Sequence, residues 1–286
     1  MSSSVLIDAQ ELATLQAQGD ANLLLVDCRY SLTDPHAGIQ AYGQGHIPGA
    51  VHADLGTLLS GPVSPRSGRH PLPDPQAFAQ GMAALGADDN TLIIAYDAQD
   101  SMFAARLWWL LRWVGHKNVR VLDGGLSAWE ASGGALSTAP ARAQPGSFSL
   151  RPSVAGTMEF NDVLANLETR EKQLLDARSP DRYRGENETL DPIGGHIPGA
   201  LNRFFKDNLA PDGRFKSATQ LRQEFQQVLG DTPPGSVLHQ CGSGVSACHN
   251  LLAMEVAGLP GGTLYPGSWS EWCRQADAPV ARGSVA

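Results

Sequence analysis

Short apolar runs alternate along the chain with stretches in which apolar residues recur every three or four positions. Runs of the first kind, which predict strands, lie at residues 23–26, 91–95, 119–122 and 236–240. Segments of the second kind, which predict helices, lie at residues 8–18, 75–85, 101–114 and 247–256. Strands that alternate with helices favour mostly parallel sheets with helices on both faces. The pattern therefore predicts an α/β protein.

The same order of elements occurs twice because the sequence contains an internal duplication. Three short segments recur at similar spacing: GHIPGA at 45–50 and 195–200, VDCR at 26–29 and LDAR at 175–178, GGLSAW at 124–129 and GSWSEW at 267–272. The region between the copies is rich in Gly, Pro, Ala and Ser, which is typical of a linker. The chain therefore consists of two related copies joined by a linker.

The length of the chain agrees with two domains. A chain of 286 residues is long enough for two domains of about 140 residues, each able to bury its own core. We predict a first domain at residues 1–135, a linker at 136–155 and a second domain at 156–286.

Net charge and cysteine content restrict the classes of binding partner and the cellular compartment that the protein is expected to have. The formal net charge is −8 and no block of Lys and Arg stands out, which disfavours nucleic acid and anionic membranes as partners. The sequence contains no apolar stretch of membrane-spanning length and no basic region of a signal peptide. The four cysteines form neither a CxxC pair nor a zinc-finger spacing, so disulfides and bound metal are not expected. These features predict a cytoplasmic protein with free thiols.

One cysteine stands where such sheets bind ligands. Cys241 follows the predicted strand 236–240 and precedes the predicted helix 247–256, at the carboxyl end of a strand. Gly242 and Gly244 permit a tight turn in which successive backbone N–H groups face the sulfur. A cysteine reacts as its thiolate, and such donors stabilise the thiolate. The loop predicts a nucleophilic cysteine that works without a metal or an organic cofactor.

The repeated DxR and GHIPGA segments, the loop CGSGVSAC and the ending LYPGSWSEW together resemble the two-domain rhodanese sulfurtransferases. The resemblance covers nearly the whole chain, and the loop is most similar to the mercaptopyruvate branch. It implies two tandem rhodanese-like domains, each a mostly parallel sheet flanked by helices on both faces. It also implies that only the second domain is catalytic, and Asp97 stands at the matching position of the first copy.

The same resemblance implies the reaction. The sulfane sulfur of 3-mercaptopyruvate passes through a persulfide on Cys241 to a thiol, a thioredoxin-like protein or cyanide, and pyruvate is released. Loop residues are expected to bind the transferred sulfur: Gly242, Gly244, Val245 and Ser246. Thiosulfate is the alternative donor.

A departure from the family pattern concerns the donor's carboxylate. Arg182 matches the family arginine that holds this group. Family members commonly carry a second arginine about nine residues further on, where this chain has Asp191. Arg184 is the predicted substitute. Without a substitute, carboxylate binding rests on Arg182 alone, and strict specificity for mercaptopyruvate is not expected.

Protonation of the departing pyruvate enolate is expected to involve the hydroxyl of Ser243. Some family members combine this serine with a histidine and an aspartate of the first domain, and the matching positions here are His46 and Asp34. The alternative for His46 is a structural role in the GHIPGA turn, with its ring bonded to the backbone as expected for His196. A Pro-rich first-domain loop borders the site at most, and no role is predicted for its basic residues: Arg66, Arg69 and His70.

Two other classes of function are compatible with a cysteine in such a loop. One is a persulfide carrier or binding module without turnover. The other is a phosphatase, but phosphatases of this kind place an arginine six residues after the cysteine to grip phosphate, and here that residue is Ala247. Sulfur transfer is therefore the favoured prediction.

Overall fold

The structure is a computed structural model that describes residues 4–19, 22–141 and 144–284. The chain forms two compact units. Unit 1 comprises Met1–Gly61, Pro73–Val154 and Pro211–Phe215, and unit 2 comprises Pro62–Leu72, Ala155–Ala210 and Lys216–Ala286. Residues 1–3, 20–21, 142–143 and 285–286 of the predicted domains and linker lie outside the described residues. In the described part of the chain, no helix is long and apolar enough to cross a membrane.

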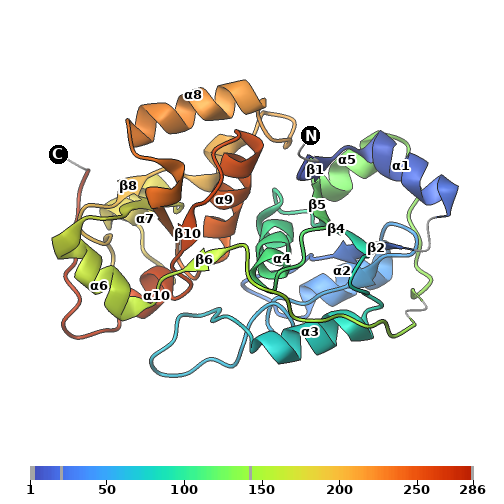
Figure 1. Cartoon of the computed structure of the whole chain (residues 1–286), viewed down its shortest axis with the longest axis horizontal. Helices are drawn as coiled ribbons and strands as arrows, with labels where there is room; N and C mark the ends of the chain where they lie inside the picture. The colour runs from blue at the N-terminus through green and yellow to red at the C-terminus, as the bar shows by residue number, and fades with distance from the viewer. Residues whose placement is uncertain (1–3, 20–21, 142–143, 285–286) are drawn as a thin grey trace. The chain divides into compact units, whose positions relative to one another are not determined.

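The described residues of unit 1 contain a five-stranded sheet of order β1-β5-β4-β2-β3 in which every pair is parallel (Figure 1). Its strands are β1 (Leu6–Ile7), β2 (Leu23–Asp27), β3 (Val51–His52), β4 (Leu92–Tyr96) and β5 (Val119–Leu122). Its helices are α1 (Ala9–Gln18), α2 (Ala37–Gln44), α3 (Pro75–Ala84), α4 (Met102–Trp113) and α5 (Gly125–Ala131). The predicted strands and helices of this copy are present within one or two residues of their expected ends.

Unit 2 repeats this topology in the residues that are described, with the parallel order β6-β10-β9-β7-β8 (Figure 1). Its strands are β6 (Gly156–Thr157), β7 (Gln173–Asp176), β8 (Leu201–Asn202), β9 (Val237–Gln240) and β10 (Thr263–Leu264). Its helices are α6 (Phe160–Thr169), α7 (Pro180–Arg184), η1 (Phe205–Asn208), α8 (Ala218–Leu229), η2 (Pro234–Ser236), α9 (Ser246–Val256) and α10 (Ser268–Trp272).

Helices cover both faces of each sheet because strand side chains alternate between the faces. In unit 1, Leu25 and Ile94 pack with Leu12 of α1 and Trp129 of α5, while α4 packs against β4 and β5. In unit 2, Leu238 packs with side chains of α6 and α10, while α9 packs against β9 and α8. These two cores hold rigid the strand ends that carry the loops.

The repeated DxR and GHIPGA segments form the same ion pair in both units. Asp176 and Arg178 are buried, and Nε and Nη2 of Arg178 donate to the Asp176 carboxylate while Nη2 also donates to the carbonyl of Gly195 at 2.7 Å. Asp27, Arg29 and the carbonyl of Gly45 repeat these contacts in unit 1. The motif therefore joins a strand end to the GHIPGA turn in each copy.

The segment predicted as a linker makes hydrogen bonds with unit 1. The N–H groups of Ser147 and Ser149 donate to the carboxylates of Asp88 and Asp89. The N–H of Arg151 donates to the carbonyl of Val114 at 3.0 Å. These contacts explain why unit 1 extends to Val154.

Each copy contributes a short arm to the other unit. Pro62–Leu72 of the first copy belongs to unit 2, and Pro211–Phe215 of the second copy belongs to unit 1. Both arms contain a Gly-Arg-aromatic triplet, GRH at residues 68–70 and GRF at residues 213–215. The arm of unit 2 is the light-blue loop that precedes α3 in Figure 1. The arms bring residues of one sequence copy to the strand ends of the other.

Candidate functional site

Cys241 lies directly after β9, at the carboxyl end of the sheet of unit 2, as the sequence predicts. Its N–H donates to Oγ of Ser268 at 3.1 Å, and its carbonyl accepts the N–H of Trp269 at 3.0 Å. Gly244 has φ of +75°, and a Cβ there would lie 2.5 Å from the carbonyl oxygen of Pro266. Only glycine fits this position without strain. The loop is thus tied to α10 on one side and leads into α9 on the other.

The cysteine loop is buried for most of its length. Cys241 is 2% exposed, and Gly242, Gly244 and Val245 are buried as well, while Ser246 at the start of α9 is half-buried. A small sulfur donor in contact with the Cys241 sulfur is therefore largely shielded from bulk water. Electrostatic contacts are stronger in such surroundings than at the surface.

The matching loop of unit 1 surrounds a carboxylate with backbone N–H groups. The buried carboxylate of Asp97 accepts four backbone N–H groups at 2.8 to 2.9 Å, from Gln99, Ser101, Phe103 and Ala104. Burial raises the pKa of Asp97, and the four donors act in the opposite direction. The loop after Cys241 derives from the same duplicated segment but differs in backbone conformation: Val245, which precedes α9, has φ of −93°, whereas Ser101, which precedes α4, has φ of +61°.

Ser243 is paired with a histidine of the arm. Its Oγ lies 2.7 Å from Nδ1 of His70, a hydrogen-bond distance. Ser243 is 7% exposed and His70 is half-buried. The arm of unit 1 carries Phe215 in place of this histidine. The Cys241 loop therefore holds a hydroxyl and an imidazole within hydrogen-bond distance of each other.

Two carboxylates orient Arg182 beside the loop. Nε and Nη2 of Arg182 donate to the buried carboxylate of Glu188 at 2.8 to 3.1 Å, and Nη2 lies 3.6 Å from Asp191. Burial alone would raise the pKa of Glu188, but its bonds to Arg182 and to the N–H of Leu190 lower the pKa below its usual value. The guanidinium of Arg182 is thus held in a fixed orientation with charged partners.

The described geometry agrees with comparisons to known proteins. Residues 8–132 and 159–275 each match the family model of the rhodanese-like domain. The chain belongs to the rhodanese family.

Similar proteins of this family span the whole chain. A probable 3-mercaptopyruvate sulfurtransferase of Pseudomonas aeruginosa is 46% identical over 99% of this chain and 100% of its own. A putative thiosulfate sulfurtransferase of Mycobacterium tuberculosis is 38% identical over 98% of both chains. The crystal structure of SseA from Escherichia coli, which is presented as a 3-mercaptopyruvate sulfotransferase, is similar to this chain with a TM-score of 0.81 and 32% sequence identity. The match covers 94% of this chain and 100% of SseA. The rhodanese fold and a relation to sulfurtransferases are shown.

Of the two roles predicted for His46, proton transfer with Ser243 and a structural role in the GHIPGA turn, the structure agrees with the second. Its ring is fully buried and stacks on Tyr42, with Nδ1 2.8 Å from the carbonyl of Tyr42 and Nε2 3.1 Å from the carbonyl of Ala139. His196 stacks on Tyr183 in the same way in unit 2. The ring of His46 therefore serves the rhodanese turn, and the geometry assigns His70 as the partner of Ser243.

Asp34 and Arg184 are also placed differently from their predicted roles. Asp34 is exposed, and its carboxylate accepts the N–H of His36 at the start of α2. Arg184, the last residue of α7, is half-buried and donates to the exposed carboxylate of Glu186 at 2.7 and 2.8 Å. These local bonds explain both residues without a substrate.

The role of His70 was hard to predict, because the Pro-rich loop that carries it has no periodic pattern of apolar residues. His70 and Ser243 are 173 residues apart, and they meet through an arm that belongs to the other unit. The available signal was the GRH triplet itself, whose counterpart GRF in the other copy lacks the titratable side chain.

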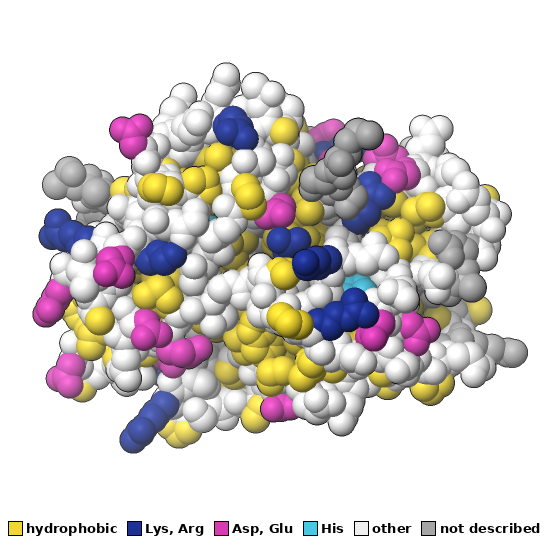
Figure 2. All heavy atoms as spheres, in the orientation of Figure 1, with side chains coloured by type: hydrophobic (Ala, Val, Ile, Leu, Met, Phe, Trp, Pro, Cys, Tyr) yellow, Lys and Arg dark blue, Asp and Glu magenta, His cyan; other side chains and the backbone are white. Residues whose placement is uncertain are grey.

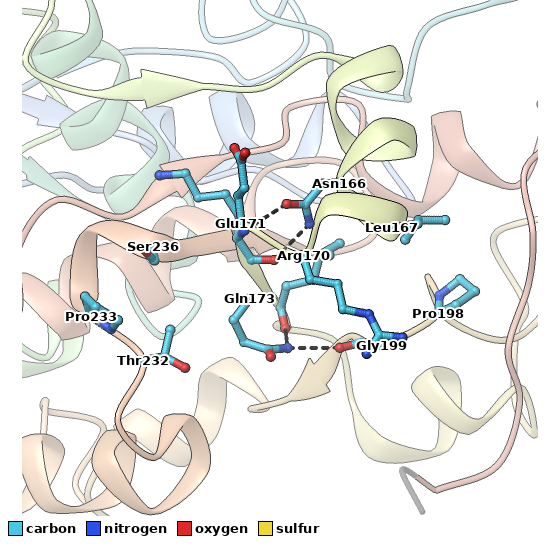
Figure 3. A pocket seen from close by; sticks show the side chains of 12 residues that line it. Asn166, Leu167, Arg170, Glu171, Gln173, Pro198, Gly199, Thr232, Pro233 and Ser236 are labelled. Atoms are coloured by element: carbon cyan, nitrogen blue, oxygen red, sulfur yellow. Dashed lines mark hydrogen bonds between the residues drawn. The ribbon is translucent and has the colours of Figure 1, made fainter.

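A pocket elsewhere in unit 2 is unrelated to this chemistry. It is lined by residues at the amino ends of β7, β8 and β9, such as Gln173, Gly199 and Ser236. Figure 3 shows the hydrogen bond from Gln173 to Gly199 in its wall. Asn166 also forms hydrogen bonds with the backbone of Lys172. A second pocket lies at the corresponding strand ends of unit 1, near Leu24 and Gly49. The repetition of this pocket in unit 1 indicates a feature of the fold, at the end of the sheet opposite to Cys241.

A buried histidine next to the loop makes stability depend on pH. His239 precedes Cys241 by two residues, and within the described residues neither of its ring nitrogens has a hydrogen-bond partner. Burial lowers the pKa of His239 to about 3, so the folded state keeps it neutral while the unfolded state gains a proton below about pH 6.5. We expect its contribution to the free energy of unfolding to fall by about 1.4 kcal/mol per pH unit below that point.

The prediction is tested by urea unfolding at pH 7 and pH 5. His239→Leu is expected to retain about 2 kcal/mol more of its stability over this interval than the wild type, because Leu carries no titrating group. His36→Gln, at an exposed position, is the control and should follow the wild type. Equal losses in wild type and His239→Leu would contradict the assignment.

Proposed function

We propose that this rhodanese-family protein is a sulfurtransferase that takes the sulfur of 3-mercaptopyruvate and passes it to a thiol. The Cys241 thiolate attacks the donor sulfur, an S–S bond forms, and the C–S bond breaks. The electron pair of the C–S bond goes to the pyruvate enolate, which takes up a proton and leaves. The remaining persulfide on Cys241 is attacked at its outer sulfur by the acceptor thiolate, and the Cys241 thiolate is regenerated.

The pair formed by Ser243 and His70 carries the assignment to mercaptopyruvate. An enolate must be protonated as it departs, and the Ser243 hydroxyl, backed by His70 at 2.7 Å, is placed to donate that proton. Sulfite, which leaves from thiosulfate, needs no proton. A serine and histidine pair beside the nucleophile is therefore useful for the first donor and dispensable for the second.

Loop chemistry also favours a donor with a single negative charge. The residues from Gly242 to Ala247 include no charged side chain, so charge on the donor meets backbone N–H groups and the nearby arginines. The carboxylates of Glu188 and Asp191 offset the positive charge of Arg182. A carboxylate suits this balance better than the thiosulfate dianion. Thiosulfate remains the second candidate, because a relative 38% identical is named for it.

The proposed acceptor is a small thiol or a reduced thioredoxin-like protein, with cyanide as an assay substitute. Figure 2 shows Lys and Arg side chains interspersed with Asp and Glu side chains on the face in view, without an extended basic surface. All four cysteines are free and buried in the structure. This is consistent with a reducing compartment, and we place the protein in the cytoplasm.

Steady-state sulfur transfer to cyanide from each donor, measured side by side, tests this function. We expect kcat/KM for 3-mercaptopyruvate to exceed that for thiosulfate by at least about tenfold, because the enolate receives its proton from Ser243. A p-nitrophenyl phosphate assay under the same conditions is the control and should show no hydrolysis. Equal or better rates with thiosulfate would assign the second donor, and absence of turnover with both would favour a persulfide carrier.

A further inference from the structure

Arg69 lies beside the cysteine loop together with Arg182. It is carried by the arm Pro62–Leu72, which belongs to unit 2, and its backbone N–H donates to Oγ of Ser270 in α10 at 3.0 Å. A Cβ placed on Gly242 would lie 2.9 Å from Nη2 of Arg69 and 3.7 Å from Nη1 and Nη2 of Arg182. Both guanidinium groups therefore border the residue that follows Cys241.

A buried carboxylate holds each of these guanidinium groups from one side. Nη1 of Arg69 donates to Asp191, whose side chain is fully buried, and Arg182 donates to Glu188 through Nε and Nη2. Within the described part of the chain, Nη2 of Arg69 and Nη1 of Arg182 have no protein acceptor. Their side chains are 24% and 20% exposed. Each arginine thus keeps N–H groups for a ligand at the loop.

We propose that Arg69 is a second carboxylate-binding residue of this enzyme, so that Arg69 and Arg182 together hold the carboxylate of the sulfur donor. The inference rests on the proposed function and names Arg69, which Asp191 contacts from its buried position, as a second arginine for the donor's carboxylate. Asp191 is then a positioning residue that orients Arg69. Two arginines balanced by two carboxylates leave the site without excess positive charge, which suits a monoanion.

The arm of unit 1 shows that this arrangement is specific to the catalytic unit. Arg214 stands where Arg69 does in the GRH triplet, but its carboxylate partner is Asp212 at 3.9 Å, and both side chains are exposed. The cradle of that unit is already filled by Asp97. Only in unit 2, among the described residues, does the arginine of this triplet contact a buried carboxylate, that of Asp191, and also border the cysteine loop at Gly242.

The test compares Arg69→Gln and Arg69→Lys with the wild type, on 3-mercaptopyruvate and on mercaptoacetone, the ketone that lacks the carboxylate. Arg69→Gln should raise KM for 3-mercaptopyruvate by about 10- to 100-fold, because a charge-assisted hydrogen bond to the donor is lost, and change kcat little. KM for mercaptoacetone should change less than about threefold. Arg69→Lys, which keeps the charge without the fork, should give an intermediate KM.

Arg66→Gln, an exposed position on the same arm, is the matched control and should retain wild-type KM. Binding of pyruvate, measured by calorimetry, adds a readout that does not need turnover and should weaken by about tenfold in Arg69→Gln. An unchanged KM, or equal losses with both donors together with a lowered melting temperature, would overturn the inference and leave Arg69 a structural role. If the wild type turned over only thiosulfate, the proposed function would fail, and pyruvate binding would still decide the role of Arg69.

Discussion

Cys241→Ser is expected to lower sulfur transfer from either donor by at least about 10³-fold, because the nucleophile that carries the sulfur between donor and acceptor is lost. A serine hydroxyl is not ionised at neutral pH and forms no stable bond to sulfane sulfur. The structure places only this cysteine of the described residues at the carboxyl end of β9, within a loop whose counterpart cradles a carboxylate.

The measurement is intact mass after incubation with donor alone, followed by turnover with cyanide. The wild type should gain about 32 Da, the mass of one sulfur atom, and Cys241→Ser should gain nothing. Cys248→Ser is the matched control, since Cys248 is buried in α9 with its Sγ 3.3 Å from the carbonyl of Gly244, a bond that serine also makes. A mass gain that persists in Cys241→Ser, or disappears in Cys248→Ser, would assign the persulfide to another cysteine.

His70→Phe and Ser243→Ala are each expected to lower kcat with 3-mercaptopyruvate by about 10²-fold or more, while turnover of thiosulfate changes less than about threefold. The difference arises because the departing enolate needs a proton and the departing sulfite does not. His70→Phe reproduces the GRF triplet of the arm in unit 1, where a phenylalanine is accommodated. The substitution therefore removes the imidazole with little change in the kind of side chain that the arm carries.

The double variant distinguishes a shared role from two separate ones. If His70 acts through Ser243, His70→Phe combined with Ser243→Ala should be no slower than the slower single variant, because residues that act as a unit are not additive. Melting temperatures of all three variants should be measured alongside, since the arm contributes to the packing of unit 2. A parallel loss with both donors would mean that the pair supports the loop and does not transfer a proton.

Local sequence signals determined the architecture and the position of the nucleophile. The strands β2, β4 and β5 and the helices α1, α3 and α4 follow from apolar periodicity, which reflects burial of one side of each element and needs no knowledge of distant residues. The strand and glycine context of Cys241 likewise identifies a loop at the carboxyl end of a sheet. The duplication showed that the position of Cys241 in one copy is taken by Asp97 in the other.

The tertiary structure decided which side chains surround the cysteine. His46 carries the expected residue type, but packing of the GHIPGA turn uses both of its ring nitrogens for backbone carbonyls. His70 and Arg69 lie on an irregular arm without periodicity, and they reach Ser243 and Asp191 only because that arm belongs to the other unit. Periodicity records whether a side chain is buried, whereas a catalytic pair between distant residues depends on where the folded backbone brings its loops.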